Sequence, residues 1–159
     1  MNAAKAVLED LARCIKQDLT RADRHVKELE AWRMAAPAGH GAYAAAFLLH
    51  HLYTAIEAVL ERALRTFDGT VPEGNNSHVQ LLAQAARPVD GVRDVILPQD
   101  EVVDDLRRFR HRVRKRYDIE PDPTLLAPLI KDALDAWPRI RNQLAKFAAF
   151  TEECARIAR

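Results

Sequence analysis

The chain has 159 residues, of which 48% are hydrophobic and only five are glycine. This composition favours an all-helical protein over a strand-rich one, and the length fits a single domain, residues 1–159. The formal net charge of +1 excludes a uniformly cationic surface. Any anionic partner would therefore bind to a local cluster of basic residues.

Residues 3–33 carry apolar side chains at intervals of three and four, which predicts one long amphipathic helix. The helix breakers in APAGHG end it, and the same spacing predicts a second helix over residues 43–67. After the loop DGTVPEGNNS, Ser77 is the expected N-cap of a short helix over residues 78–86.

A fourth helix is expected over residues 99–117, and EPDP ends it because residues before proline avoid helical geometry. Thr124 is the expected cap of a last helix whose apolar positions reach Phe147. Together these elements predict an all-α fold, an antiparallel helical bundle of four long helices and one short helix.

Residues 34–56 contain no Asp, Glu, Lys or Arg, but Pro37, Gly39 and several histidines interrupt them. A membrane span needs about 20 mainly apolar residues, so no membrane association is expected. The N-terminus carries charges throughout and has no signal-peptide core. Cys14 and Cys154 have no paired spacing, which favours free thiols in a reducing compartment. We therefore expect a soluble, cytoplasmic protein.

The segment RRFRHRVRKR, residues 107–116, holds six arginines and one lysine but no acidic residue. Without these seven cations the chain has 17 basic and 23 acidic residues, a net charge of −6. A basic strip on an acidic body favours a local anionic partner, although a solvated helix face balanced by carboxylates has the same pattern. Contact with a nucleic-acid backbone along one exposed face is compatible with this segment.

Helical geometry predicts how these side chains are distributed when Phe109 and Val113 face the core. One group is expected to line a single cleft edge: Arg110, His111, Arg114, Lys115 and Tyr117. The remaining arginines are expected to fan outward: Arg107, Arg108, Arg112 and Arg116. In the cleft Arg110 is the first candidate for phosphate contact, because a guanidinium holds phosphate through two parallel hydrogen bonds.

Other chemistries have little support in the residue pattern. No Gly-rich phosphate loop, Ser-centred elbow or dinucleotide fingerprint is present, so no cofactor is expected. His50 and His51 point about 100° apart on a helix, and His78 is distant in sequence, so a metal site is disfavoured. Glu57 lies beside the apolar stripe of the second helix, where pairing with Arg110 would satisfy both charges.

The segment FRHRVRKRYDIE, preceded by LLHHLYTAIEAVLERALRTFDGTVPEGNNSH, resembles the HepT-like branch of the HEPN superfamily. That branch commonly carries an LLH-x-LYT-x-IE-x-x-x-ER helix, a loop ending in histidine and then FRH-x-x-RH-x-Y. The resemblance implies a helical homodimer that places arginine–histidine motifs in a shared cleft. It also implies a metal-independent ribonuclease of a toxin–antitoxin pair, partnered by a minimal nucleotidyltransferase.

Carried over by residue, the motif arginine is Arg110 and the tyrosine is Tyr117, which in some members receives AMP. The motif histidine is replaced by Lys115. Histidine suits proton transfer near neutral pH, whereas a solvated lysine serves as an electrostatic clamp. Burial beside Arg110 and Arg114 would favour a neutral lysine that acts as a base, and His111 offers another route to proton transfer.

Two functions therefore remain in competition. The first is an RNA-cleaving toxin, of full or reduced rate, in which Arg110, Lys115 and His111 are catalytic candidates and Arg107 and Arg114 bind RNA. The alternative is a non-catalytic module that binds RNA or nucleotide and docks a nucleotidyltransferase. An unrelated bundle with a solvated charged face is a third possibility.

Overall fold

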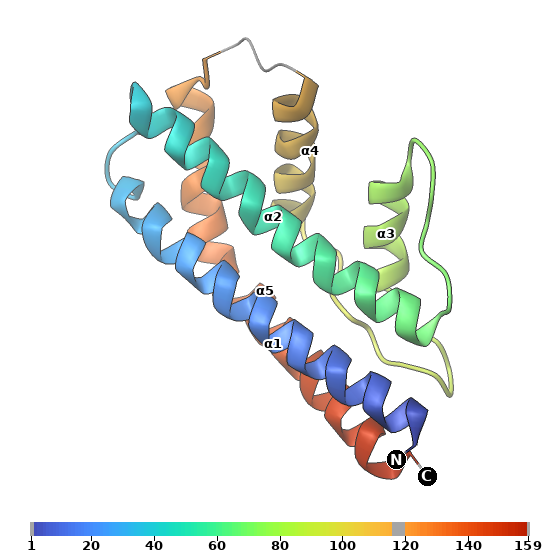
Figure 1. The fold of residues 1–159 in the computed structure, drawn as a ribbon. Coiled ribbons are helices and arrows are strands. Elements are labelled where there is room, and N and C mark those ends of the chain that lie inside the picture. Colours follow the sequence, from blue (N-terminus) through green and yellow to red (C-terminus); the bar gives the residue numbers. More distant parts are fainter. Residues whose placement is uncertain (1, 116–119, 159) are drawn as a thin grey trace. The chain divides into compact units, whose positions relative to one another are not determined.

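The computed structural model describes residues 2–115 and 120–158, which form an all-α fold (Figure 1). Its helices are α1 (Ala3–Leu29), α2 (His40–Phe67), α3 (Ser77–Ala85), α4 (Glu101–Lys115) and α5 (Pro123–Ile157), and a 3-10 turn, η1 (Glu30–Trp32), extends α1. Among the described residues the only β contact is an isolated bridge between Val89 and Arg93. The predicted helical bundle of four long helices and one short helix is confirmed.

Two predicted helix caps are wrong by one or two residues. Ser77 is already helical in α3, and Asn76 occupies the N-cap position. At the start of α5, Asp122 is the cap, because its Oδ1 accepts hydrogen bonds from the backbone N of Thr124 at 2.9 Å and from Thr124 Oγ1 at 2.7 Å. Pro123 therefore takes the first helical position, where its missing N–H leaves no bond unmade.

α4 begins at Glu101, two residues after the predicted start near Gln99, and Asp100 caps its first turn. Asp100 Oδ1 accepts the backbone N–H of Val102 at 2.9 Å, and Arg139 of α5 donates to both carboxylate oxygens at 2.8 and 3.1 Å. Burial alone would raise the pKa of Asp100, but the hydrogen bonds from Arg139 and Val102 hold it below its usual value. The cap thus joins α4 to α5.

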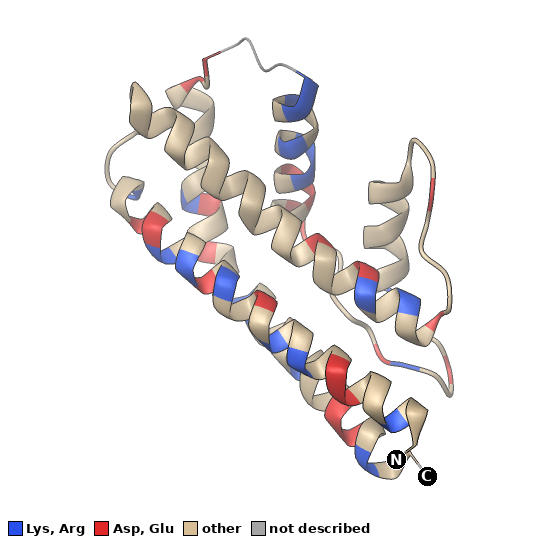
Figure 2. Cartoon of the chain, viewed as in Figure 1, with Lys and Arg blue, Asp and Glu red and all other residues tan. Residues whose placement is uncertain are grey.

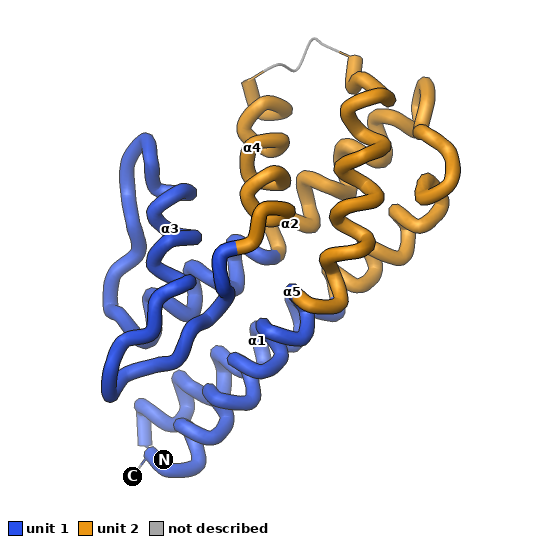
Figure 3. Tube along the Cα trace, turned by 180° about the vertical axis from the view of Figure 1, so that it is seen from behind, with its two compact units in different colours: residues 1–20, 56–99, 140–159 blue, residues 21–55, 100–139 orange. Residues whose placement is uncertain are grey.

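The helices form two compact units, drawn in two colours in Figure 3. Unit 1 consists of residues 1–20, 56–99 and 140–159, and unit 2 consists of residues 21–55 and 100–139. α3 belongs to unit 1 and α4 to unit 2, whereas α1, α2 and α5 each contribute a part to both. A single domain over residues 1–159 stays a prediction.

In unit 1 the first turns of α1 lie beside the last turns of α5 (Figure 1). An ion pair between Lys16 and Glu152 joins the two helices. Their interior is apolar and ends in three aromatic rings whose centroids lie 5.6 to 5.8 Å apart, those of Phe67, Phe147 and Phe150. Close packing of such rings contributes beyond the area they bury, so this cluster stabilises the α2–α5 contact.

Arg93 organises the loop between α3 and α4. Its side chain is fully buried, and its Nε and Nη2 donate to the two carboxylate oxygens of Asp68 at 2.6 and 2.9 Å. The guanidinium also donates to the backbone carbonyls of Arg87 at 2.6 Å and of Gln84 at 3.2 Å. Because a buried guanidinium needs partners for its donors, the loop is fixed around this side chain.

In unit 2, α2, α4 and α5 share an apolar core. The buried side chains include Leu49, Leu52 and Tyr53 of α2, Val103 and Leu106 of α4, and Leu126 and Ile130 of α5. Trp137 is also buried, and its Nε1 donates to Asp23 of α1 at 2.8 Å. This core sets the rotation of α4 about its own axis, because Val103 and Leu106 have to face inward.

α2 is long and apolar enough to cross a membrane by length and composition, with a mean hydropathy of 1.2 over its most apolar window. In the fold, 56% of that window is buried inside the protein. The charge-free stretch is therefore explained by packing inside the protein.

Arg93→Ala should lower the free energy of unfolding by about 3–5 kcal/mol, because it leaves the Asp68 carboxylate without its buried partner. Urea unfolding followed by circular dichroism measures the change. Arg65→Ala, which removes an exposed arginine of the same unit, should change stability by no more than about 0.5 kcal/mol. An equal effect of the two substitutions would contradict the role of Arg93.

The stabilisation by Arg93 should also depend on pH. The hydrogen bond from Arg93 holds the pKa of Asp68 below its usual value, with a smaller contribution from Gln84. A depressed folded-state pKa stabilises the protein above the unfolded value, about 3.9, and this contribution is lost as pH falls through the folded pKa. The advantage of the wild type over Arg93→Ala should therefore be complete at neutral pH and shrink below about pH 4.

Candidate nucleic-acid interface

The charges of α4 change along its length, from acidic side chains at its start to basic ones at its end (Figure 2). Asp104 accepts from Arg107 Nε at 2.7 Å and lies 2.7 Å from Arg108 Nη2, while Asp105 lies 3.6 Å from Arg108 Nη1. These two arginines are thus balanced within their own helix. Arg107, a predicted RNA-binding residue, has a structural partner in Asp104, and its role toward RNA stays a prediction.

Beyond these pairs, α4 borders a cavity of about 580 Å3 in unit 2. Three stretches line it: Tyr43, Ala46, Phe47, His50 and His51 of α2; Phe109, Arg110, Arg112, Val113 and Arg114 of α4; and Glu120, Pro121, Asp122, Leu125 and Leu126 at the start of α5. Its walls are mainly apolar and aromatic, with three guanidinium groups among them. A cavity of this kind and size accommodates one small organic group beside an anion.

Arg110 lies where the cavity meets the core. Its side chain is half-buried, and its Cζ lies 5.9 Å from the ring centroid of Tyr53, which is fully buried. A guanidinium over an aromatic face is attracted by the ring electrons and keeps its planar donors oriented. Arg110 is therefore a directed cation at the cavity wall, as a phosphate contact requires.

Arg114 lines the same cavity one helical turn further on, as expected, and Arg112 joins it. The expectation that Arg112 fans outward was wrong. No carboxylate of the described residues pairs with Arg112 or Arg114, in contrast to Arg107 and Arg108. Those two arginines remain available for an anion.

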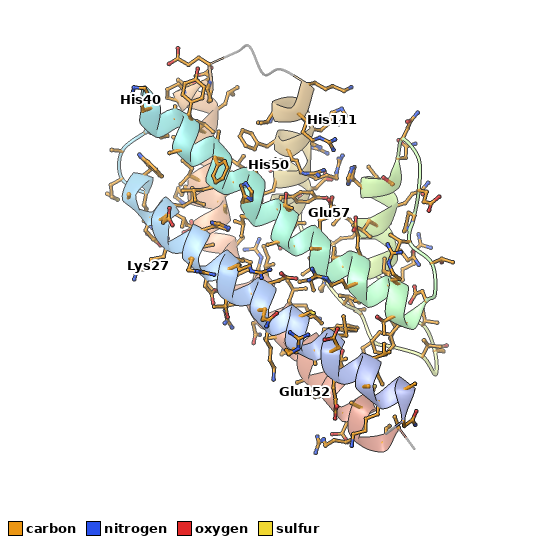
Figure 4. The ribbon with its side chains drawn as sticks, viewed as in Figure 1. Lys27, His40, His50, Glu57, His111 and Glu152 are labelled. Carbon is orange, nitrogen blue, oxygen red and sulfur yellow. The ribbon has the colours of Figure 1, made fainter. Side chains whose placement is uncertain are left out.

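His111 and Lys115 do not line the cavity, contrary to the expectation that they share an edge with Arg110 and Arg114. Both side chains are exposed, and Figure 4 shows His111 on the side of α4 turned away from His50. The physical reason lies in the helix: at about 100° per residue, positions 111 and 115 are about 160° from Val113. Their catalytic roles stay predictions.

The exposure of Lys115 bears on the mechanism. A lysine base requires a desolvated ammonium group, and this side chain is open to solvent in the single chain. Tyr117, the predicted site of modification, lies outside the described residues.

Glu57, the predicted supporting carboxylate, is buried in unit 1, and its Oε2 lies 2.6 Å from Nδ1 of His78. His78 stands in the first turn of α3 and is partly exposed. This histidine satisfies part of the buried carboxylate, so a structural role for Glu57 has a local explanation. A pairing of Glu57 with Arg110 stays a prediction.

His50 and His51 line the same cavity as the arginines of α4. The sequence pattern considered them only as poor metal ligands and did not place them in the site. Their ring centroids are 5.5 Å apart, with the ring planes at 86°. The sequence feature that could have pointed to these histidines is their position in the charge-free part of α2, which is tan in Figure 2. A helix face without acidic side chains leaves neighbouring arginines unpaired.

His51 is further enclosed by two rings. Phe47 lies at a centroid distance of 4.1 Å and His25 of α1 at 5.7 Å. Burial lowers the pKa of His25, and the neighbouring His51 lowers it further. Both His25 and His51 are thus held partly away from solvent.

No group of three His, Cys, Asp or Glu side chains within residues 2–115 and 120–158 is arranged to hold a metal ion. A family model described as HepT-like protein matches residues 44–151, which include α2 from its second turn, all of α4 and most of α5. Comparison with curated proteins and with solved structures found no match.

The histidine cluster yields a titration prediction. His25 should titrate below its ordinary value of 6.5, and His51→Asn should move its pKa back upward, because the charge repulsion from His51 is removed while burial remains. NMR of the histidine ring protons against pH measures both values. An unchanged pKa of His25 in the variant would show that the two rings do not interact.

Proposed function

Because the chain belongs to the HepT-like protein family, we propose that it is a cytoplasmic, metal-independent RNA-cleaving toxin of a toxin–antitoxin pair. It acts as a homodimer and is neutralised by a minimal nucleotidyltransferase. The observation that carries this proposal is the arginine-lined cavity of unit 2, in which Arg110, Arg112 and Arg114 stand beside aromatic and histidine rings.

The two kinds of side chain in the cavity match the two parts of a nucleotide. The guanidinium groups suit the phosphates, and two of them have no described carboxylate partner. Tyr43 and Phe47 offer aromatic faces on which an unpaired base can stack, a contact that tolerates any base. Single-stranded RNA is favoured over a duplex, because in a duplex the base faces are covered.

Cleavage proceeds by attack of the 2′-hydroxyl on the adjacent phosphorus, with departure of the 5′-oxygen. Arg110 binds the phosphate oxygens and stabilises the charge that accumulates on them. Lys115 contributes a positive charge near the end of α4 without entering the cavity.

A specific observation favours the second candidate, a non-catalytic module that binds RNA or nucleotide. The residue at the position of the motif histidine, Lys115, is exposed, and so is His111. Loss of an acid–base group reduces the rate of such a reaction by about 10²- to 10⁴-fold. If no other residue supplies proton transfer, the protein binds RNA and cuts it slowly or not at all.

Exposed apolar side chains around the cavity support the homodimer. Tyr43, Phe47 and Leu125 are 53, 59 and 63% exposed, and all three line the cavity. Exposed apolar patches of this kind mark interaction sites. A second copy seated against Leu125 covers that part of the patch and leaves Tyr43 and Phe47 facing the groove, to which it adds a second set of arginines in a two-fold arrangement typical of homodimers.

Arg110→Ala should abolish the growth arrest caused by induced expression and lower RNA affinity by about 10- to 100-fold, since a hydrogen bond to a charged group is lost. Growth curves and fluorescence anisotropy with a labelled single-stranded RNA measure the two effects. Arg108→Ala is the matched control, because that arginine is exposed and balanced by Asp104.

Lys115→Ala and Lys115→His separate the two candidate functions in the same assays. If the wild type arrests growth and both Arg110→Ala and Lys115→Ala remove the arrest, catalysis involves Lys115 as well as Arg110. Arrest seen only with Lys115→His would identify a disabled nuclease. RNA binding without arrest in any version would favour the non-catalytic module, and neither binding nor arrest would refute both.

Leu125→Glu should convert the dimer into a monomer, because it places a charge in the apolar patch that the second copy covers. Light scattering coupled to size exclusion measures the mass. Met34→Glu, a change at a 93% exposed residue outside the cavity lining, should leave the dimer intact. A monomeric wild type would refute the dimer while leaving the RNA-binding proposal standing.

A further inference from the structure

We propose that His50 and His51 of α2 carry the proton transfers of RNA cleavage, in place of the motif histidine that Lys115 replaces. The juxtaposition that supports this is a pair of histidine rings lining the same cavity as Arg110. The inference rests on the proposed function, because it assigns the acid–base chemistry of that reaction to two residues of the same site.

His50 and His51 line the cavity, whereas the exposed catalytic candidates of α4 do not. His111 and Lys115 lie on the opposite side of α4 from Val113 and do not line the cavity. His78, which pairs with the carboxylate of Glu57, belongs to unit 1 and does not line the cavity either. Within the described cavity lining, histidine is the only side chain whose ordinary pKa lies near neutrality.

The geometry of the two rings suits a reaction with two proton transfers. Attack of the 2′-oxygen and departure of the 5′-oxygen occur on opposite sides of the phosphorus, so the proton acceptor and the proton donor approach from different directions. The rings of His50 and His51 stand nearly perpendicular, at 86°, with centroids 5.5 Å apart. Adjacent positions on a helix differ by about 100°, which gives two imidazoles of different orientation at one site.

The cleavage step balances with these groups alone. The neutral imidazole of one histidine takes the proton of the 2′-hydroxyl as the O2′–P bond forms. The imidazolium of the other gives its proton to the 5′-oxygen as the P–O5′ bond breaks. The products are a 2′,3′-cyclic phosphate and a 5′-hydroxyl, and Arg110 stabilises the phosphate charge between the two transfers.

Charged groups on every neighbouring element act on the pair. His25 of α1 faces His51 at 5.7 Å. The same cavity is lined by the guanidinium groups of Arg110, Arg112 and Arg114 from α4 and by the carboxylates of Glu120 and Asp122 before α5. The Asp122 carboxylate is already bonded to Thr124 at the helix cap. Three guanidinium groups and two carboxylates therefore line the cavity together with the two imidazoles.

The test measures cleavage and binding separately, with a fluorescein-labelled single-stranded RNA and its all-deoxy counterpart. His50→Gln and His51→Gln should each lower the cleavage rate at saturating RNA by about 10²- to 10⁴-fold while RNA affinity changes little. His→Ala variants at the same two positions should regain part of the rate when imidazole is added. His40→Gln is the matched control, because this histidine of α2 is exposed and outside the cavity lining.

A structural role would not produce this combination of effects. Catalytic loss should remove one limb of the bell-shaped dependence of rate on pH, and circular dichroism should show the same helix content in each variant. The deoxy strand should bind and remain uncut, because it lacks the attacking hydroxyl.

Three outcomes distinguish this inference from the function on which it rests. Slow variants with normal binding and imidazole rescue support it. A wild type that cleaves, with His50→Gln and His51→Gln variants that cleave equally fast, overturns the inference and leaves the nuclease in place. A wild type that binds RNA but cleaves none of it at any pH overturns both, and the non-catalytic module remains.

Discussion

The site depends on one constraint: Arg110 is a cation held against a buried aromatic ring. The face of Tyr53 fixes the direction of the guanidinium, and the apolar cavity beside it keeps that charge from full solvation. A charge in such surroundings interacts more strongly with a phosphate than one in water does. The described part of the basic segment thus contains two groups of arginines: Arg107 and Arg108 are balanced by acids of their own helix, whereas Arg110, Arg112 and Arg114 line the cavity.

α2 makes this arrangement possible because its first half carries no charge. An acidic or basic side chain on that face would pair with the arginines or repel them, and it would occupy the cavity. Instead, the helix presents Tyr43, Phe47, His50 and His51, which combine aromatic surface with the capacity to carry protons. The property that makes α2 resemble a membrane span therefore serves both the core and the candidate site.

In the proposed reaction, the replacement of the motif histidine by Lys115 moves proton transfer from α4 to α2. In the resembling family the arginine and the histidine stand on one helix. In this chain the corresponding lysine is exposed, and the histidines that line the cavity with Arg110 come from α2. Under that proposal phosphate binding and proton transfer are divided between two helices, so the activity would depend on how α2 and α4 pack around the buried side chains of Val103, Leu106 and Leu52.

Sequence periodicity and breakers were sufficient to determine that the chain folds as five helices, with boundaries close to those observed, and the motif strings identified its family. They were sufficient because helix formation and family patterns are local along the chain. Local pattern failed at the caps, where Asp122 rather than Thr124 binds the first turn, since either side chain can cap and only the surrounding contacts choose. Only the tertiary structure decided that Arg112 faces the cavity, that His111 and Lys115 do not, and that His50 and His51 stand opposite Arg110. The reason is physical: spacing gives angles around one helix, but which of those angles meets a second helix depends on how buried residues from distant parts of the sequence fit together.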